Sequence, residues 1–344
     1  MKRFMNGWLT LLALSIVASG CSGLNALRPV THPNASSLSA APLGASLANK
    51  QILVVSAAPS ASLSTFRANA NGTPTPLRMI SGANTGLVFT WRGAILADGR
   101  LWVVNQMKPE RFSNARAFAS TANGNVPASE VVRCLFNMDG GTIGLDAQGF
   151  IYVAGVNDNV YVYSPGTRGC VSPVRDITGS HTLLNGPNIA VDPTGIVYSA
   201  NFFSNTVTSY PAGSTGDVTP TQDIAGPATQ LVNPGPIAVD ANGETFVLDH
   251  NFTNSTEFNI LVFAPSATGD VAPVRDIKGP ATLLVNSTSI AVTSDGWVFV
   301  ANARNGNGLI TVFPPGATGD VVPTHVIHGS SNSFGYPIGV AVQP

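Results

Sequence analysis

The chain has 344 residues, of which 44% are hydrophobic and only 10% are charged, and it contains 35 Gly and 25 Pro. Few charges with many glycines and prolines favour short strands joined by tight turns over long helices. The formal net charge is −1, or −3 without the two cations Lys2 and Arg3, so the chain lacks a basic surface and we expect no nucleic-acid partner.

The first twenty residues have the features of an export signal. Lys2 and Arg3 precede an apolar run at residues 8–18, which is too short to span a bilayer comfortably. Small residues at 18–20 then lead directly into Cys21. We therefore predict that residues 1–20 are a signal peptide that is removed on export.

The segment around Cys21 resembles the lipobox of bacterial lipoproteins, in which the cysteine is acylated and becomes the new N-terminus. Ala18 stands where leucine is commoner, and an ordinary signal peptide with an incidental cysteine is the alternative. The resemblance implies a membrane anchor at Cys21. Because Ser22 rather than Asp follows it, it also implies an outer-membrane protein of the bacterial cell envelope, facing the periplasm or the cell surface.

Residues 21–50 are rich in Ser, Ala, Leu and Pro and show no period of a helix or a strand. We predict a flexible tether, and a coil of about 29 residues has a typical reach of roughly 30 Å. The globular part is then expected at residues 51–344.

Two cysteines, Cys134 and Cys170, remain after the tether. An even pair in an oxidising compartment predicts a disulfide. Two unpaired buried thiols are the alternative, which the separation of the two residues decides. No Cys and His spacing indicates a zinc site.

One pattern recurs along the chain, clearly in residues 188–201, 236–249 and 289–302 and more weakly in 95–105 and 144–154. Each copy has a short apolar run, a turn with glycine, and a run of aromatic and β-branched residues. The turn glycines are separated by 50, 46, 48 and 53 residues, and they are Gly99, Gly149, Gly195, Gly243 and Gly296. Repeats of this length predict the blades of a β-propeller.

Each copy predicts four strands. The first is apolar throughout, which implies burial on both faces, and glycine supplies the positive φ of the turn that follows it. The third strand precedes a Thr-Gly-Asp turn that recurs at Thr215, Thr268 and Thr318. We interpret this turn as structural because a catalytic residue is needed only once. The fourth strand carries charge and proline, which predicts an exposed edge.

The wording of the copies, Ile-Ala-Val-Asp-x-x-Gly and then Ile-x-Val-Phe, resembles NHL-repeat propellers over about residues 51–342. The resemblance implies the fold and says little about function, since the family includes scaffolds, ligand binders and a few enzymes. Innermost strands are expected near residues 93–97, 142–146, 188–192, 236–240, 289–293 and 338–342. We therefore predict an all-β, six-bladed propeller with four antiparallel strands per blade.

The two ends of the repeat array are predicted to share one blade. The sixth innermost strand comes at the end of the chain without a second strand to pair with, and residues 51–56 form an apolar strand at the other end. Pairing these two segments closes the ring and removes an open sheet edge.

The loops between second and third strands and between fourth and first strands lie on one face of such a propeller, where we expect the ligand. The second-to-third loops begin at short polar residues, so a polar or metal-binding mouth is one interpretation. The other is that Asn and Asp cap the strand ends. The candidate residues at this position are Asn105, Asn201, Asp249 and Asn302.

Charged and aromatic side chains on the same loops give further ligand-face candidates, because aromatic and Arg residues are enriched where partners bind. They could equally pack the loops onto the top of the ring. These candidates are Trp91 and Arg92 on a fourth-to-first loop, with Lys108, Arg111, Phe202, Phe203 and His250 on second-to-third loops.

An enzyme is the less favoured hypothesis. No Gly-x-Ser-x-Gly elbow or phosphate-binding loop is present, and the histidines are too few for a zinc lyase. In six-bladed gluconolactonase-like hydrolases, Glu, Asn and Asp hold a divalent metal at the channel mouth. Asn201, Asp249 and Asn302 could supply part of such a site, but no glutamate stands at the start of a first strand.

We therefore predict an exported, monomeric binding module of the cell envelope, with a protein, a glycan or a small molecule as its ligand. A metal-dependent, lactonase-like hydrolase is the alternative. We expect no cofactor, apart from a divalent cation such as calcium if the alternative holds.

Overall fold

The computed structural model describes residues 47–58, 61–97, 99–107, 112–136, 141–155, 157–251, 257–303, 308–330 and 333–343. The predicted signal peptide, Cys21 and most of the predicted tether lie outside these residues. No helix in the described part has the length and hydrophobicity needed to cross a bilayer.

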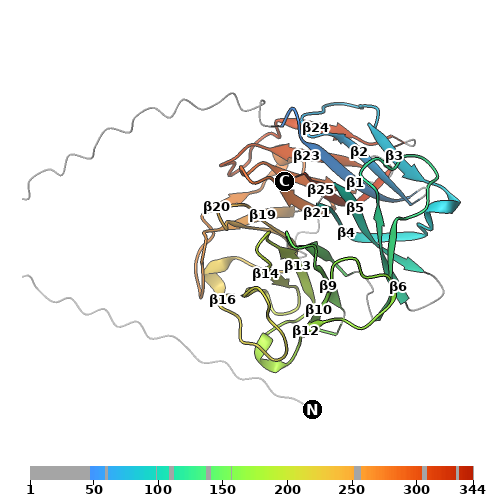
Figure 1. The fold of residues 1–344 in the computed structure, drawn as a ribbon. Helices are drawn as coiled ribbons and strands as arrows, with labels where there is room; N and C mark the ends of the chain where they lie inside the picture. The colour runs from blue at the N-terminus through green and yellow to red at the C-terminus, as the bar shows by residue number, and fades with distance from the viewer. Residues whose placement is uncertain are drawn as a thin grey trace, which may run out of the picture. The chain divides into compact units, whose positions relative to one another are not determined.

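Six antiparallel sheets form the ring, as Figure 1 shows, and the strands of each blade follow one another from the channel outward. Blade 1 has β25 (Tyr336–Val342), β1 (Gln51–Ala58), β2 (Ser62–Arg67) and β3 (Arg78–Ser81) in this order. Blade 2 has β4 (Phe89–Ala97), β5 (Arg100–Met107), β6 (Phe112–Phe118) and β7 (Glu130–Phe136). Blade 3 has β8 (Ile143–Leu145), β9 (Ile151–Gly155), β10 (Asn159–Tyr163) and β12 (Arg175–Ile177).

Blade 4 has β13 (Pro187–Val191), β14 (Val197–Asn201), β15 (Thr206–Tyr210) and β16 (Gln222–Ile224). Blade 5 has β17 (Pro234–Val239), β18 (Thr245–Asn251), β19 (Glu257–Phe263) and β20 (Arg275–Ile277). Blade 6 has β21 (Ser287–Val292), β22 (Val298–Asn302), β23 (Leu309–Phe313) and β24 (His325–His328). The predicted six-bladed, all-β fold is confirmed.

The ring closes as predicted, with the last strand of the chain in the same blade as the first. β25 pairs antiparallel with β1, and Ile52 lies opposite Val342. In Figure 1 the red β25 runs beside the blue β1. The first blade therefore takes its innermost strand from the far end of the sequence.

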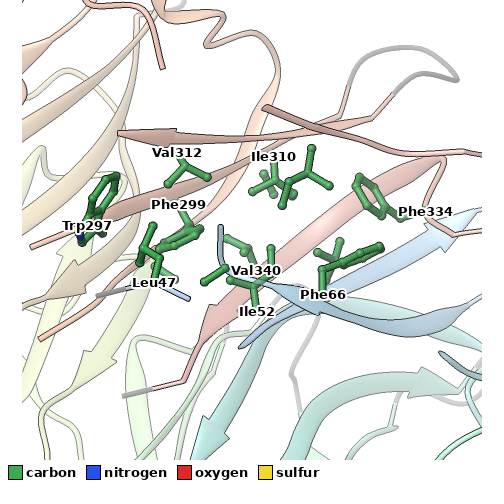
Figure 2. Close-up of a cluster of buried hydrophobic side chains, with 14 residues drawn as sticks. Leu47, Ile52, Phe66, Trp297, Phe299, Ile310, Val312, Phe334 and Val340 are labelled. Carbon is green, nitrogen blue, oxygen red and sulfur yellow. The ribbon is translucent and has the colours of Figure 1, made fainter. Parts of the chain in front are cut away.

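A cluster of buried apolar side chains joins blade 6 to blade 1, and Figure 2 shows it. Phe66 of β2 packs edge-on against Phe334, with ring centroids 5.5 Å apart. Leu47 belongs to this cluster and is fully buried. The predicted tether extended to residue 50, but the packed part of the chain already includes Leu47, because this side chain is buried in the same cluster as Trp297 and Phe299.

Five further apolar clusters fill the other spaces between neighbouring blades. The one between blades 3 and 4, for example, combines Val160 and Val162 with Ile189 and Val197. Since each blade buries apolar side chains on both faces, neighbouring blades stabilise one another around the ring.

In the described connections from fourth to first strands, four begin with a short 3-10 turn: η1 (Ala83–Thr85), η2 (Ser180–Thr182), η3 (Pro227–Thr229) and η5 (Pro280–Thr282). Each ends on a buried threonine whose hydroxyl donates to the carbonyl of the glycine three residues earlier, at 2.6–2.7 Å. The residue after this threonine has a left-handed backbone conformation. For a residue with a Cβ, such as Leu183, that conformation costs roughly 1–2 kcal/mol.

The outermost strands are not the free edges that their charge and proline predicted. Each lies beside a glycine from the third-to-fourth turn of the next blade, as Ile177 does beside Gly216. In blade 2 this contact is long enough to form a fifth strand, β11 (Gly169–Cys170), parallel to β7. The turns therefore cover the rim of the preceding blade.

Candidate functional site

The innermost strands enclose a central channel with a cavity volume of about 170 Å³. Its described lining comes from blades 1, 3, 4, 5 and 6 and consists of apolar residues, Gly144, and the two hydroxyl residues Thr142 and Ser289. Both hydroxyls accept a backbone N–H from the next blade, from Ile189 at 2.8 Å and from Val340 at 3.1 Å. No charged side chain occurs among these lining residues.

Asn105, Asn201, Asp249 and Asn302 form what we call the support ring, and all four side chains are fully buried. Each accepts a hydrogen bond from a backbone N–H just before an innermost strand, at 2.8–3.4 Å. The donors are Val88, Asn185, Val232 and Val285, which we call the lip.

This arrangement favours the structural interpretation of the four polar residues. Each of them binds the lip residue that precedes its own blade, and Asn302 also donates to the carbonyl of Val300 in its own strand at 3.1 Å. Asn201 illustrates how fully the polar atoms are occupied, since its amide nitrogen donates to both Thr206 and Thr208. Their predicted role as ligand contacts stays a prediction.

Asp249 is the one carboxylate of the support ring. Its Oδ1 accepts hydrogen bonds from the backbone N–H groups of Val232 and Asn233, each at 3.1 Å. Burial raises the pKa of Asp249, and the two backbone hydrogen bonds offset this only in part.

Asn201, Asp249 and Asn302 are the residues that were predicted to supply part of a metal site. They belong to three successive blades, and the hydrogen bonds described for each go to its own lip residue or to its own blade. No set of three or more His, Cys, Asp and Glu side chains in the described part is placed to hold a metal ion. A divalent cation held by Asn201, Asp249 and Asn302 stays a prediction, and no chemistry is assigned to one.

Phe203 is the most exposed large apolar side chain of the described residues, at 71%. It lies in the turn between β14 and β15, where its N–H donates to the carbonyl of Asn185 at 3.2 Å. Its ring packs edge-on against half-buried Phe202, with centroids 5.2 Å apart. A Cβ on Gly186 would lie 2.6 Å from the Phe203 ring, so glycine is needed there to seat it.

His250 lies in β18, directly after Asp249, and its ring stacks on Phe258 at 4.2 Å. Asn233 fastens this strand end, because its amide donates to the His250 carbonyl at 3.1 Å. The sequence left open whether the loop aromatics pack onto the ring or bind a partner. Phe202 and His250 pack on neighbouring aromatic rings, whereas Phe203 is exposed and available for a partner.

Other exposed apolar residues on this face escaped the sequence prediction. Leu183, Val88, Val232 and Tyr336 are each more than one-third exposed, and all lie in fourth-to-first connections or at their ends. The available signal was a repeated Leu-Val pair before the first strand, at 87–88 and 231–232. In both pairs the leucine is more buried than the valine, and only the valine is exposed.

The remaining candidates are only partly described. Trp91 and Arg92 were predicted on a loop, but their backbone lies within β4, at a break in its pairing with β5 between Thr90 and Ala94. Their side chains, and Lys108 and Arg111 altogether, lie outside the described residues.

Cys170 is disulfide-bonded. It lies opposite Arg133 in the pairing of β11 with β7, so its backbone is next to that of Cys134. The side chain of Cys134 lies outside the described residues, and the pairing of these two cysteines stays a prediction that the strand register supports.

Neither a protein-family model nor a curated protein matches the chain. Solved structures do match its fold. A protein of unknown function from Bacteroides caccae is 9% identical with a TM-score of 0.55, covering 85% of this chain and 98% of its own. A candidate 6-phosphogluconolactonase from Bacteroides fragilis is 13% identical with a TM-score of 0.56, covering 86% and 98%.

A periplasmic gluconolactonase from Pseudomonas aeruginosa is also similar, at 16% identity and a TM-score of 0.50, with 83% of this chain and 80% of its own covered. At such identities the likeness concerns the propeller fold alone. The predicted NHL-repeat resemblance has no counterpart among these matches.

Proposed function

We propose that this protein is a lactonase-like propeller that takes a neutral sugar-acid lactone at the mouth of its central channel and hydrolyses the ester ring. The observation that carries the proposal is the channel, which combines about 170 Å³ of space with described walls that hold no charged side chain. A cavity of roughly 150 Å³ already admits one six-membered ring.

The described walls of the channel carry no charge, which favours the ester over its product. Burying an unpaired carboxylate costs far more than burying a neutral ring, because the anion loses its hydration without gaining a partner. The neutral lactone therefore enters at a lower cost than the hydroxy-acid anion, which is expelled after hydrolysis. Two of the similar structures carry lactonase names, which supports a lactone as the ligand. The uncharged described walls favour the unphosphorylated lactone named for the Pseudomonas aeruginosa protein over the phosphorylated one named for the Bacteroides fragilis protein.

The ligand-face candidates divide into contacts and supports in this proposal. Phe203 offers an exposed aromatic face to the ring. The support ring fixes the lip on which the ligand rests. His250, half-buried on the same face, is the titratable side chain that we assign to activating water, since hydrolysis of an ester needs a general base.

Export and lipid anchoring belong to the same proposal. The segment before Cys21 and the periplasmic location named for the Pseudomonas aeruginosa protein support a site outside the cytoplasm. Acyl chains on Cys21 would hold the propeller at the outer membrane of the cell envelope.

Acid release from glucono-δ-lactone at constant pH tests the activity, with spontaneous hydrolysis subtracted. The proposal expects catalysed release that saturates with lactone, and its loss in His250→Ala. Folded wild-type protein with no release above the spontaneous rate would overturn the hydrolase assignment.

Phe203→Ala tests the contact. Loss of aromatic stacking is worth about 0.5–1.5 kcal/mol, so we expect KM to rise roughly 2- to 10-fold. Val274→Ala is the matched control, because Val274 is 55% exposed but lies just before β20, at the other end of the blade. Equal effects of both substitutions would contradict a contact at Phe203.

A binding module without catalysis is the second candidate, and the absence of titratable side chains among the described channel walls favours it. It predicts saturable binding of the hydrolysis-inert lactam, measured by calorimetry, without acid release from the lactone.

A further inference from the structure

Neighbouring blades are fastened by one repeated device at the rim, which we call the clasp. A glycine in the third-to-fourth turn of one blade exchanges two backbone hydrogen bonds with the outermost strand of the preceding blade. Between blades 4 and 5, for example, Gly269 donates to Asp223 at 2.6 Å and accepts from Ala225 at 3.1 Å. The clasp glycines are Gly72, Gly124, Gly169, Gly216, Gly269 and Gly319, all with φ between 70° and 79°.

The residue before the glycine usually adds a side-chain acceptor to the clasp. Thr215, Thr268 and Thr318 accept the N–H of the aspartate in the neighbouring outermost strand, at 3.2–3.5 Å. Asn71 and Asn123 do the same for Val326 and Met79, at 2.9–3.0 Å. Five of the six junctions therefore share this contact.

The residue after the glycine adds a second acceptor at four junctions. Asp217, Asp270, Asp320 and Asn125 accept a backbone N–H from the 3-10 turn of the preceding blade, at 2.6–2.7 Å. A glycine lies against each of these side chains, and a Cβ on Gly226 would come within 2.5 Å of Asp270. Each of these junctions therefore needs a glycine in the preceding blade to make room for the acceptor side chain.

The junction between blades 2 and 3 departs from this pattern at both positions. Arg168 precedes Gly169, and an arginine has no acceptor atom. Cys170 follows it where the aspartate stands elsewhere, and this cysteine is exposed and disulfide-bonded. The backbone pairing of β11 with β7 is kept.

We propose that the disulfide of Cys170, with Cys134 as its partner, replaces the two missing side-chain contacts and makes this junction a redox-sensitive seam in the ring. A dithiol opens it by exchange: the S–S bond breaks, two thiols form, and the dithiol is oxidised to its own disulfide with transfer of two electrons and two protons. The seam is fastened only in an oxidising compartment.

Opening the bond leaves the blade 2–blade 3 contact weaker than any of the four fully clasped junctions. The apolar cluster between these blades, including Trp102 and Ile143, still holds them together. Reduction therefore loosens one junction without unfolding the ring, and strand β7 becomes the part of the ring that opens first. The seam is independent of the proposed ligand.

Thermal unfolding and hydrogen exchange of the intact protein, with and without a phosphine reductant, test the seam. Reduction is expected to lower Tm by roughly 5 °C or more. It should also speed amide exchange in β7 and β11 while leaving Ala228 and Ala281, at clasped junctions, unchanged. Equal acceleration at all junctions, or two titratable thiols in the unreduced protein, would overturn the proposal.

Two variants separate the seam from a general loss of stability. The double variant Cys134→Ala, Cys170→Ala should have the Tm and the amide exchange of the reduced wild type, and adding reductant should change neither. Adding a clasp, through Arg168→Thr and Cys170→Asp in the Cys134→Ala background, should regain part of the lost Tm and also ignore reductant. A clasped variant no more stable than the alanine pair would contradict the equivalence of disulfide and clasp.

Discussion

Asp249 shows how much one atom matters in a repeated position. Three blades place an asparagine where blade 5 has this aspartate, and all four side chains accept a lip N–H. The asparagines do so without charge. The aspartate gains a second backbone donor, Asn233, but has to bury an ionised group.

We expect Asp249→Asn to fold normally and Asp249→Ala to be strongly destabilised. Alanine leaves the partly buried N–H groups of Val232 and Asn233 without their carboxylate acceptor, at up to about 1–3 kcal/mol each. Urea unfolding measures the difference between the two variants. An alanine variant as stable as the asparagine variant would show that water replaces the carboxylate.

The Asp249→Asn substitution should also change how the stability of the protein depends on pH. Burial raises the pKa of folded Asp249 above the unfolded value of about 3.9. Its contribution to stability is therefore greatest below that value and is lost as pH rises through the folded pKa. The Tm gain of Asp249→Asn over wild type should be larger at pH 7 than near pH 4. The mirror variant Asn201→Asp should lose Tm at pH 7 and recover it on acidification.

At the scale of elements, the periodicity of the sequence predicted where the strands lie. It did not predict what the outermost strands contact. The first and second strands were predictable because their apolar runs and turn glycines repeat, and the sixth copy ends where β25 does. The outermost strands were misjudged as free edges. Their cover is a turn of the next blade, and the only trace of it in the sequence is the repeated Thr-Gly-Asp.

The candidate site was less predictable for a similar reason. Asn201 and Asp249 occur at strand ends in a pattern that a ligand ring and a structural ring would share. Only the positions of Val232 and the other lip residues, seventeen residues away for Val232 and Asp249, distinguish the two. A pattern within one strand end does not reveal a hydrogen bond to a residue seventeen positions away. Phe203 does lie in a loop as predicted, but the sequence did not show that its side chain is exposed.

Removing residues 338–344 should open the ring. The truncation deletes most of β25 and leaves β1, including buried Ile52 and Val54, without its partner. We expect a lower Tm and a broadened transition in circular dichroism. Removal of Pro344 alone is the control. A truncated protein that melts cooperatively at the parental temperature would show that closure through β25 adds nothing.

At the scale of the whole molecule, the six apolar clusters and the clasps make a circular array in which no blade is terminal. A linear repeat array frays from its ends, because the end repeats have one neighbour fewer. In the closed ring, β1 and β25 should exchange amide hydrogens as slowly as β18 in blade 5, as measured by mass spectrometry. Faster exchange confined to β1 and β25 would mean that the ring opens at the closure.

The closure also sets an order of events during biosynthesis. β1, β2 and β3 are made early, but blade 1 has no innermost strand until residues 336–342 have been made. Until then β1 presents an unpaired apolar edge that can pair with another chain. Blade 1 should therefore be the last blade to be completed, in whichever compartment the chain folds.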